Sequence, residues 1–389
     1  MDDLDLDTIE RLRRTAVRDL RLAGDAIDPE TLGDAVRRAA ADERLLLTAD
    51  EEDALVRRVL DEALGLGPLE AAMRDPEVTE IMVCGPSQVW LERGGRLQPS
   101  TLRFADDGHV LHVIDRILSP VGRRVDEASP MVDARLRDGS RVNVVIPPLA
   151  VDGPVITVRR FSTRRLDGDD LVARGALGDD VLAFLGTAVA ARRNILVSGG
   201  TGSGKTTVLG ALAAFVPPGE RIITVEDAAE LRVPAPHVVR LEARPAAADG
   251  RGEVTIRALV RNALRMRPDR IVVGEVRGGE ALDMLTAMTT GHAGSLSTIH
   301  ASSPAEAVGR LQLLASMADV DVPYAAIAEH VRAAIDLIVH LERDAEGTRR
   351  VTEVARLGDD GALGALTRMG GDGVLHMRPD AASHPGRSR

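Results

Sequence analysis

RNILVSGGTGSGKTTVLGAL, at residues 193–212, joins two apolar segments through a glycine-rich turn. The run NILVSG predicts a β-strand, and the run TTVLGALAAF predicts a helix. The turn between them matches the spacing G-x-x-x-x-G-K-[ST] of a Walker A phosphate loop, with Gly199, Gly204, Lys205 and Thr206 at the fixed positions. Because both flanking elements that the motif requires are present, we prefer this interpretation to a glycine-rich turn without a ligand.

The match predicts how this segment binds anions. Glycines let backbone N–H groups turn inward around phosphate oxygens, and the N-terminus of the following helix adds the positive end of its dipole. Lys205 is the only lysine among the 49 lysine and arginine residues of the sequence. A slender ammonium group fits a tight loop in which a broad guanidinium does not, so shape explains the exception. The residues expected to bind the phosphates are Gly199, Gly200, Thr201, Gly202, Ser203, Gly204, Lys205, Thr206 and Thr207.

The composition is that of an ordinary soluble protein of 389 residues, 44% of them hydrophobic and 28% charged. No segment approaches the ~18 to 20 consecutive apolar residues of a membrane span, and the acidic start MDDLDLDTIE differs from a signal peptide, so we expect a cytoplasmic protein. The single cysteine, Cys84, excludes an internal disulfide, and we expect it to pack as a small hydrophobe. The net charge of −11 argues against broad adhesion to nucleic acid.

Changes in periodicity along the chain predict its domains. Charged and leucine-type positions alternate over residues 1–63, which predicts a helical extension with solvated charged faces. Strand-like runs and a helix near residues 106–118 predict a small α+β domain over residues 64–165. The polar segment 166–178 is expected to be a linker, and residues 361–389 have the composition of a disordered tail.

Apolar strands alternate with helical periods over residues 179–360. This alternation is typical of βαβ units, so we expect an α/β domain with a mostly parallel sheet and helices on its faces. Sheets of this kind bind their ligands at the carboxyl ends of the strands. The phosphate loop follows one of these strands, and the polar residues that follow the others are therefore the candidates for chemistry.

Polar side chains accompany three further strands of this domain. RIITV is followed by the carboxylates Glu226, Asp227 and Glu230. RIVVGEV brings Glu275 to a strand end, in the position of a Walker B acid that lies near Mg²⁺ and polarises the attacking water. In TGHAGSLSTIHA, His292 precedes a strand and His300 ends it.

Each of these residues also has a structural explanation that needs no ligand. The alternatives are a solvated loop carboxylate for Glu226 or Glu230, a helix-capping acid for Glu275, and a satisfied structural histidine for His292 or His300. Their order and mutual spacing argue against that explanation for the whole set.

The four segments together resemble a known family. GGTGSGKTT, TVEDAAEL, RMRPDRIVVGEVRG and TGHAGSLSTIHA resemble the Walker A, Asp box, Walker B and His box of the type II/type IV secretion ATPases. DPEVTEIMVCGPSQVWLERGG, DGSRVNVVIPPLAVDGPVITVRRF and RNALRMRPDRIVVGEVRG resemble the CpaF-like branch, which serves Tad (Flp) pili. The resemblance covers roughly residues 64–358. Cys84 departs from the asparagine expected in that branch, but it lies far from the four motifs in the sequence.

The resemblance implies a RecA-like P-loop ATPase core behind a separate N-terminal domain, assembled as a homohexameric ring that binds ATP between the two domains. It implies that Lys205 contacts the β- and γ-phosphates and that Thr206 and Glu275 hold Mg²⁺. Glu275 would also orient or activate the attacking water. His292 is included among the catalytic candidates as a member of the His box.

The resemblance also implies roles for side chains outside the Walker motifs. Glu226 and Glu230 would support the metal and the water, and His300 would sense the γ-phosphate. Arg141 and Arg159, from the N-terminal domain, would reach the phosphates and lose their partner when the γ-phosphate leaves. Both arginines lie on strand-like segments, where a surface ion pair explains them equally well.

Three classes of function follow from these observations. The leading one is a mechanochemical ATPase that acts at the inner face of the cell membrane and pushes an inner-membrane platform protein during pilus assembly or protein secretion. The second is a nucleic-acid translocase on the same core, which needs a basic or aromatic-rich channel. The 2% aromatic content and the net charge of −11 speak against nucleic acid as a partner. The third is a non-catalytic, nucleotide-gated scaffold, which requires loss of the water-activating acid, whereas Glu275 is present.

Overall fold

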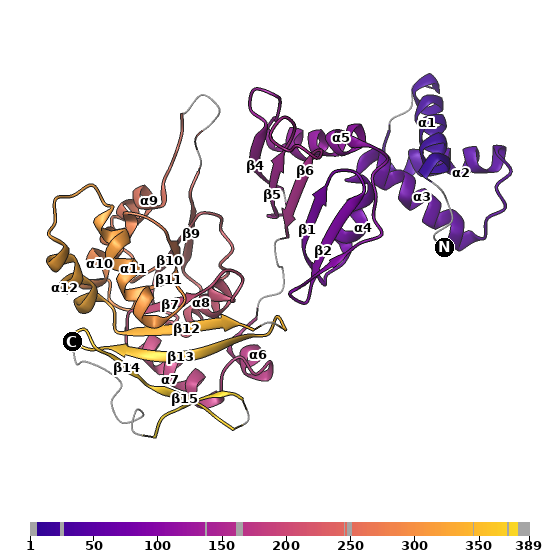
Figure 1. Ribbon diagram of the computed structural model, residues 1–389. Helices are drawn as coiled ribbons and strands as arrows, with labels where there is room; N and C mark the ends of the chain where they lie inside the picture. The colour runs from indigo at the N-terminus through magenta and orange to yellow at the C-terminus, as the bar shows by residue number, and fades with distance from the viewer. Residues whose placement is uncertain are drawn as a thin grey trace. The chain divides into compact units, whose positions relative to one another are not determined.

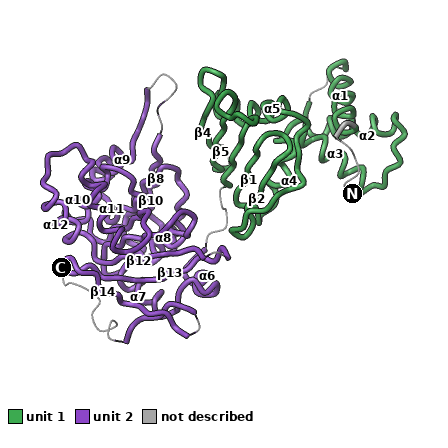
Figure 2. Tube along the Cα trace, in the orientation of Figure 1, with its two compact units in different colours: residues 1–163 green, residues 164–389 purple. Residues whose placement is uncertain are grey.

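The computed structural model describes residues 6–23, 27–136, 138–160, 166–244, 246, 251–344, 346–371 and 373–379. The chain divides into two compact units, unit 1 over residues 1–163 and unit 2 over residues 164–389 (Figure 1, Figure 2). None of the described helices combines the length and the apolar composition needed to span a membrane.

Unit 1 begins with three helices that share an apolar cluster. They are α1 (Leu6–Ala23), α2 (Pro29–Asp42) and α3 (Ala49–Leu64). Asp28 and Thr48 begin α2 and α3 as N-caps, each in a reciprocal capping box that satisfies backbone N–H groups at the helix start. The side chains buried between the helices include Leu12, Leu20, Leu32, Val36, Leu55 and Val59. Arg116 ties the helices to the rest of unit 1, because its guanidinium donates to the carbonyl oxygens of Glu62 and Gly65.

The rest of unit 1 is an α+β region with an antiparallel sheet. Within the described residues its strands follow the order β3-β2-β1-β6-β5-β4. Their bounds are β1 (Val78–Cys84), β2 (Gln88–Arg93), β3 (Arg96–Pro99), β4 (Met131–Arg135), β5 (Arg141–Val145) and β6 (Val155–Arg159). Apolar side chains from α4 (Glu70–Arg74) and α5 (Asp107–Leu118) belong to the same apolar core as one face of the sheet. Cys84 is exposed at the end of β1, so the expectation that it packs as a small hydrophobe is wrong.

Unit 2 is built on one large sheet. In the described residues its order is β14-β13-β12-β7-β11-β10-β8-β9; the strands from β12 to β9 run parallel, and β13 and β14 are antiparallel to their neighbours. The strands are β7 (Ile195–Gly199), β8 (Ile222–Glu226), β9 (Val238–Glu242), β10 (Arg270–Val276), β11 (Leu296–His300), β12 (Leu337–Arg343), β13 (Arg349–Leu357) and β14 (Leu363–Ala365). The mostly parallel α/β sheet is confirmed.

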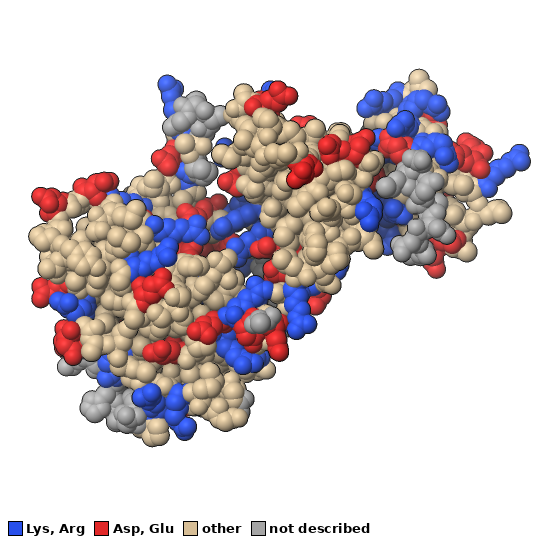
Figure 3. All heavy atoms as spheres, viewed as in Figure 1, with Lys and Arg blue, Asp and Glu red and all other residues tan. Residues whose placement is uncertain are grey.

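Helices cover both faces of this sheet. The first face packs on α7 (Asp179–Ala190) and α8 (Lys205–Ala213), and the second on α9 (Ile256–Ala263), α10 (Glu280–Thr289), α11 (Pro304–Ser316) and α12 (Tyr324–Ala334). Every residue of β7 and β8 is buried, which is why these strands are continuously apolar instead of alternating. On the face of unit 2 seen in Figure 3, basic and acidic side chains are interspersed.

The amino ends of the strands are joined by buried polar side chains. Asn194 is fully buried just before β7, where its Oδ1 accepts the backbone N–H groups of Gly294 and Ser295 and its Nδ2 donates to the carbonyl of Ala334. The fully buried Arg270 donates to the carbonyls of Val189 and Gly294. These bonds fix the level at which β7, β10 and β11 begin.

Two expectations about the ends of unit 2 need correction. Segment 166–178 contains α6 (Gly168–Ala173), and its Leu171 and Leu177 are buried in the core of unit 2, so it is not a linker. Segment 361–389 contains β14, β15 (Thr367–Met369) and β16 (Leu375–Met377), so up to Met377 it is not a disordered tail. Its glycines allow the tight turns between these strands. Residues 380–389 lie outside the described residues.

Replacing Asn194 with alanine should lower the free energy of unfolding by about 2–4 kcal/mol, because the backbone groups that it satisfies stay buried without partners. Chemical denaturation followed by circular dichroism measures this change. Asn262→Ala, at an exposed position of α9, is the control and should stay within about 0.5 kcal/mol of the parent. Equal stability of the two variants would show that the Asn194 bonds do not anchor the sheet.

Candidate functional site

The phosphate loop turns directly from the end of β7. A Cβ on Gly199 would lie 2.5 Å from the carbonyl oxygen of Leu341 and 2.6 Å from the Ser203 Oγ, closer than atoms can approach, so only glycine fits there. Gly202 and Gly204 have φ angles of 68° and 97°, which side chains rarely tolerate. These positions explain why the motif needs glycine.

Lys205, the first residue of α8, folds back over the loop. Its Nζ donates to the carbonyl oxygens of Gly199 and Gly200 at 3.0 and 2.9 Å and lies 3.8 Å from a carboxylate oxygen of Glu275. The backbone N–H of Ser203 also points to the Gly200 carbonyl, at 3.4 Å. An ammonium group, a backbone N–H and a helix N-terminus therefore converge inside the loop, as an anion site requires.

Three other predicted residues lie at the same edge of the sheet as the loop. β11, β10 and β8 follow β7 in that order and run parallel to it, so their carboxyl ends meet at one edge. His300 lies directly opposite Gly199 in the strand pairing. Glu275 and Glu226 lie at the ends of β10 and β8. The structure thus brings together side chains as far apart in the sequence as Lys205 and His300.

Glu226 is a buried carboxylate with two different oxygens. Its Oε2 accepts the backbone N–H groups of Glu230 and Leu231, both at 2.9 Å, and thereby holds the turn after β8. Its Oε1 is buried without a hydrogen-bond partner. Burial raises the pKa of the Glu226 carboxyl, although the two backbone bonds oppose the shift. Gly274 makes this placement possible, because a Cβ there would lie 2.8 Å from the Glu226 Cγ.

Glu275 has an arginine partner that was not among the predicted residues. The Arg277 guanidinium donates to the Glu275 Oε2 and lies 3.7 Å from a carboxylate oxygen of Asp227. Arg277 therefore joins the ends of β10 and β8 across the site. The motif RIVVGEVRG contains this arginine, two positions after the acid, so its sequence position offered a signal for it.

A second unpredicted pair lies beneath the loop. The Oγ of Ser198, one residue before Gly199, is 2.9 Å from the Nδ1 of His340 on β12. Both side chains are buried, and burial lowers the pKa of His340. The pair links β7 to β12 immediately before the loop begins.

Within unit 2, His292 is a predicted residue that the structure does not bring to the loop. It lies in the turn before β11, where its carbonyl accepts the Ser295 hydroxyl, close to the residues bonded by Asn194. His300 ends the same strand, and a five-residue strand spans about 16 Å. The two histidines therefore occupy opposite edges of the sheet.

The two predicted arginines lie in unit 1. Arg141 begins β5 and Arg159 ends β6, directly opposite each other in the strand pairing. The Arg159 Nε is 3.8 Å from a carboxylate oxygen of Glu80, which is its cross-strand partner on β1. The ion pair considered as an alternative for Arg159 is therefore present in the structure.

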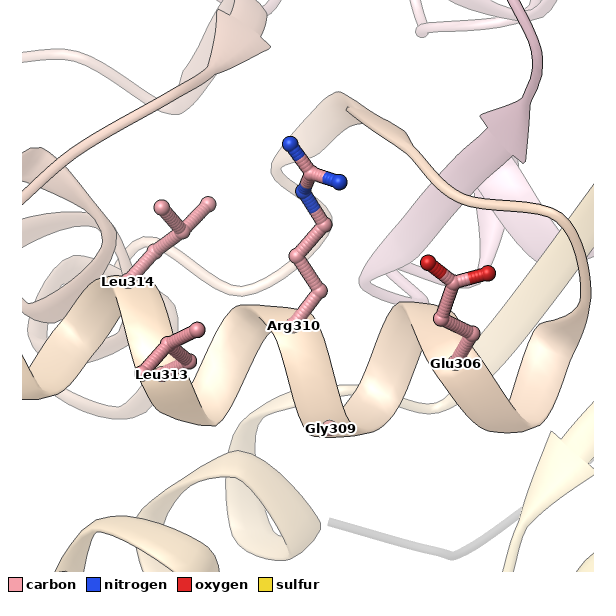
Figure 4. A pocket seen from close by; sticks show the side chains of 5 residues that line it. All are labelled: Glu306, Gly309, Arg310, Leu313 and Leu314. Atoms are coloured by element: carbon pink, nitrogen blue, oxygen red, sulfur yellow. The ribbon is translucent and has the colours of Figure 1, made fainter.

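A separate pocket lies on the outward side of α11 (Figure 4). Its lining residues are Glu306, Gly309, Arg310, Leu313 and Leu314. None of them belongs to the predicted set. Glu306 accepts from the backbone N–H and the hydroxyl of Ser302, and these bonds lower the pKa of the Glu306 carboxyl.

The site offers the groups that would bind a nucleoside triphosphate and Mg²⁺. The loop offers N–H groups and the Lys205 ammonium for phosphate oxygens, and Thr206 offers a hydroxyl at the start of α8. Glu275 and the Oε1 of Glu226 are carboxylate oxygens, the kind of ligand that Mg²⁺ takes together with water and substrate phosphates. The buried, unpartnered Oε1 of Glu226 is the observation that supports this fit most directly.

Comparison with known proteins gives a consistent result. A family described as type II/IV secretion system protein matches residues 62–369. A putative conjugal transfer protein of Mycobacterium tuberculosis (strain H37Rv) is 42% identical over 334 residues, covering 84% of this chain and 94% of that protein. The type IV secretion system protein VirB11 of Brucella suis biovar 1 is 31% identical over 332 residues, covering 78% of this chain and 92% of that protein.

Among solved structures, the Legionella pneumophila ATPase DotB matches with a TM-score of 0.56 and 22% sequence identity, over 75% of this chain and 80% of that one. At this identity the match concerns the fold, and it confirms a RecA-like α/β core. The family match begins at residue 62, so α1 and α2 lie outside it.

The raised pKa of Glu226 predicts a pH-dependent contribution to stability. A carboxyl whose folded-state pKa lies above its ordinary 4.5 favours the folded state below that value, and this contribution is lost as the pH rises through the folded pKa. Glu226→Gln stays neutral, so its free energy of unfolding should increase relative to the parent between about pH 4 and about pH 8. Urea denaturation at both pH values measures the difference.

Glu329→Gln, at a position where the side chain is 80% exposed, is the matched control and should show a difference from the parent that does not change with pH. The same pH dependence in both variants would mean that Glu226 ionises as an exposed glutamate does.

Proposed function

The chain belongs to the family of type II/IV secretion system proteins, and on that basis we propose that it is a Mg²⁺-dependent ATPase that powers pilus assembly or secretion. The observation that supports this most directly is the meeting of the phosphate loop, Lys205, Glu275 and Glu226 at one edge of the sheet. The name ATPase on the DotB structure, which shares this fold, agrees with the proposal.

In the proposed reaction a water oxygen attacks the γ-phosphorus of ATP, and the bond to the β–γ bridging oxygen breaks to give ADP and phosphate. Glu275 orients this water and takes its proton. Lys205 exchanges the carbonyls of Gly199 and Gly200 for β- and γ-phosphate oxygens, and the loop N–H groups bind the charge that develops on them. When bound, Mg²⁺ neutralises phosphate charge; Thr206 and Glu275 would hold it.

The other residues at the strand ends support this chemistry in the proposal. The Oε1 of Glu226 takes a water or the metal, and Glu230 follows in the turn that Glu226 holds. His300, opposite Gly199, senses the γ-phosphate. Arg277 keeps Glu275 directed toward the loop by binding its outer oxygen. His292 remains a proposed site residue only on the basis of the His box motif, because its turn lies at the amino end of β11, away from the loop.

We further propose that the protein works as a homohexamer with an inner-membrane platform protein as its partner, in the CpaF-like branch that serves Tad pili. The names of the relatives, a putative conjugal transfer protein and a type IV secretion system protein, support a role in secretion or transfer. Light scattering with a non-hydrolysable ATP analogue measures the assembly, and a strict monomer would contradict it. Arg141 and Arg159 are proposed phosphate ligands in that assembly. Removing either should then lower kcat more than it changes KM.

Glu275→Gln should leave ATP binding intact and lower ATP turnover at least ~10²-fold, the scale expected for losing a general base. Steady-state phosphate release measures turnover, and equilibrium binding of a fluorescent ATP analogue measures affinity. Glu329→Gln, an exposed change of the same kind on α12, should hydrolyse ATP at the parental rate. If Glu275→Gln hydrolysed ATP at close to the parental rate, Glu275 would not be the acid that activates the water.

Lys205→Arg should lower ATP turnover severely although the charge is kept, because the wide guanidinium does not fit where the Lys205 side chain, 10% exposed, places its ammonium inside the loop. Chemical labelling tests the same site independently. Lys205 and the α-amino group are the only aliphatic amines of this chain, so an amine-selective reagent should modify at most these two. Saturating Mg-ATP should protect Lys205. If Lys205 were labelled equally with and without Mg-ATP, the phosphates would not bind beside Lys205.

A further inference from the structure

The hairpin of β12 and β13 extends beyond the end of β7 and runs along the phosphate loop. Leu341 pairs with Gly199, so β12 continues past the last residue of β7 by Glu342 and Arg343. β13 returns antiparallel, and Arg349 lies directly opposite Arg343. Figure 1 shows the two strands side by side, next to α8 and β7.

Both arginines contact the outer side of the loop. The Arg349 Nε donates to the carbonyl oxygen of Gly202 at 2.8 Å, and its Cδ lies 3.6 Å from where a Cβ of Gly204 would be. The nearest group to a Cβ on Gly202 would be the Arg343 guanidinium, at 3.2 Å. The hairpin thus contacts the loop at the two glycines whose backbone conformations depend on the absence of a side chain.

The bond to Gly202 determines the direction of the next N–H. The Gly202 carbonyl and the Ser203 N–H belong to one trans peptide unit and therefore point in opposite directions. With the carbonyl held outward by Arg349, the Ser203 N–H points inward to the Gly200 carbonyl, where Lys205 also donates. An anion in the loop meets that N–H already oriented, so binding does not have to turn the peptide.

A β-bulge decides which arginine faces the loop. The pairing of β12 with β13 shifts between His340, opposite Glu353, and Leu341, opposite Val351, so Thr352 is the extra residue. Without this bulge Arg350 would lie opposite Arg343, on the face that carries α8, and Arg349 would lie on the other face. Arg350 instead pairs with Glu342 on the face away from the loop.

From this geometry we propose that Arg349 is a positioning residue for nucleotide binding: it holds the Gly202–Ser203 peptide of the phosphate loop in its anion-binding orientation, and it couples the β12–β13 hairpin to the nucleotide. The proposal deepens the ATPase function proposed above and rests on it for the identity of the ligand. Arg349 acts through the Gly202 carbonyl oxygen, so it is proposed as a positioning residue and not as a phosphate ligand. Arg350 supplies the matched control, since it is the adjacent exposed arginine of the same strand.

The test compares Arg349→Met with Arg350→Met in the full-length protein. Both arginines are exposed, so both variants should fold, which circular dichroism checks before exchange and binding are compared. In the nucleotide-free protein, amide hydrogen exchange of the phosphate-loop peptide should be faster in Arg349→Met and unchanged in Arg350→Met. A fluorescent ATP analogue with Mg²⁺ should bind about tenfold more weakly to Arg349→Met, the scale of a lost bond to a charged donor, and with parental affinity to Arg350→Met.

Coupling is reciprocal, so nucleotide should slow amide exchange in the residues that begin β13 in the parent and in Arg350→Met, but not in Arg349→Met. Equal loop exchange and equal nucleotide affinity in the two variants would overturn the proposal. These readouts do not use hydrolysis. A parent that binds nucleotide but does not hydrolyse it would refute the proposed ATPase activity while leaving the role of Arg349 open to the same measurements.

Discussion

The end of β7 has room for a hydrogen atom and for no side chain. At Gly199 the Leu341 carbonyl and the Ser203 hydroxyl both lie within 2.6 Å of the place that a Cβ would occupy. This contact lets the loop leave the sheet while β7 is still paired with β12 and β11 on its two sides. Any larger residue would separate β12 from β7 or expel Ser203 from the loop. Lys205 donates to the Gly199 carbonyl oxygen and His300 pairs with Gly199, so both lie beside this close approach.

Residues at the amino ends and at the carboxyl ends of the strands in the large sheet have different roles. At the amino ends, Asn194 and Arg270 use buried hydrogen bonds to fix where the strands start. At the carboxyl ends, one carboxylate oxygen of Glu275 lies 3.8 Å from the Lys205 ammonium in the loop. The Oε1 of Glu226 is buried without a hydrogen-bond partner. Because the parallel strands have similar lengths, fixing where they begin also fixes where their carboxyl ends lie relative to one another. The residues that fix the strand starts therefore differ from those proposed to act on the nucleotide, except that Glu226 also holds the turn after β8.

The sequence was sufficient for the features whose signal is local. The strand, the glycine spacing and Lys205 occupy one continuous segment, and alternating strands and helices place Glu226 and Glu275 at the same edge. His292 shows where local signals fail. It is only eight positions from His300 in the sequence, but those positions include the whole of β11, so the two side chains lie at opposite ends of that strand. Arg349 and His340 could not be predicted, since their places depend on strand pairing and on a bulge. The roles of the site residues stay predictions.

The bulge at Thr352 makes the hairpin sensitive to length more than to chemistry. Glu342 and Arg350, on the face away from the loop, are exposed, so exchanges there should leave the pairing unchanged. Insertion or deletion of a single residue within the paired part of β13 that precedes the bulge is different, since it moves the residues between that point and the turn to the opposite face. A comparison among relatives should therefore weigh the number of residues in this hairpin before their identity. Two chains with the same arginines but different counts would not have the same loop support.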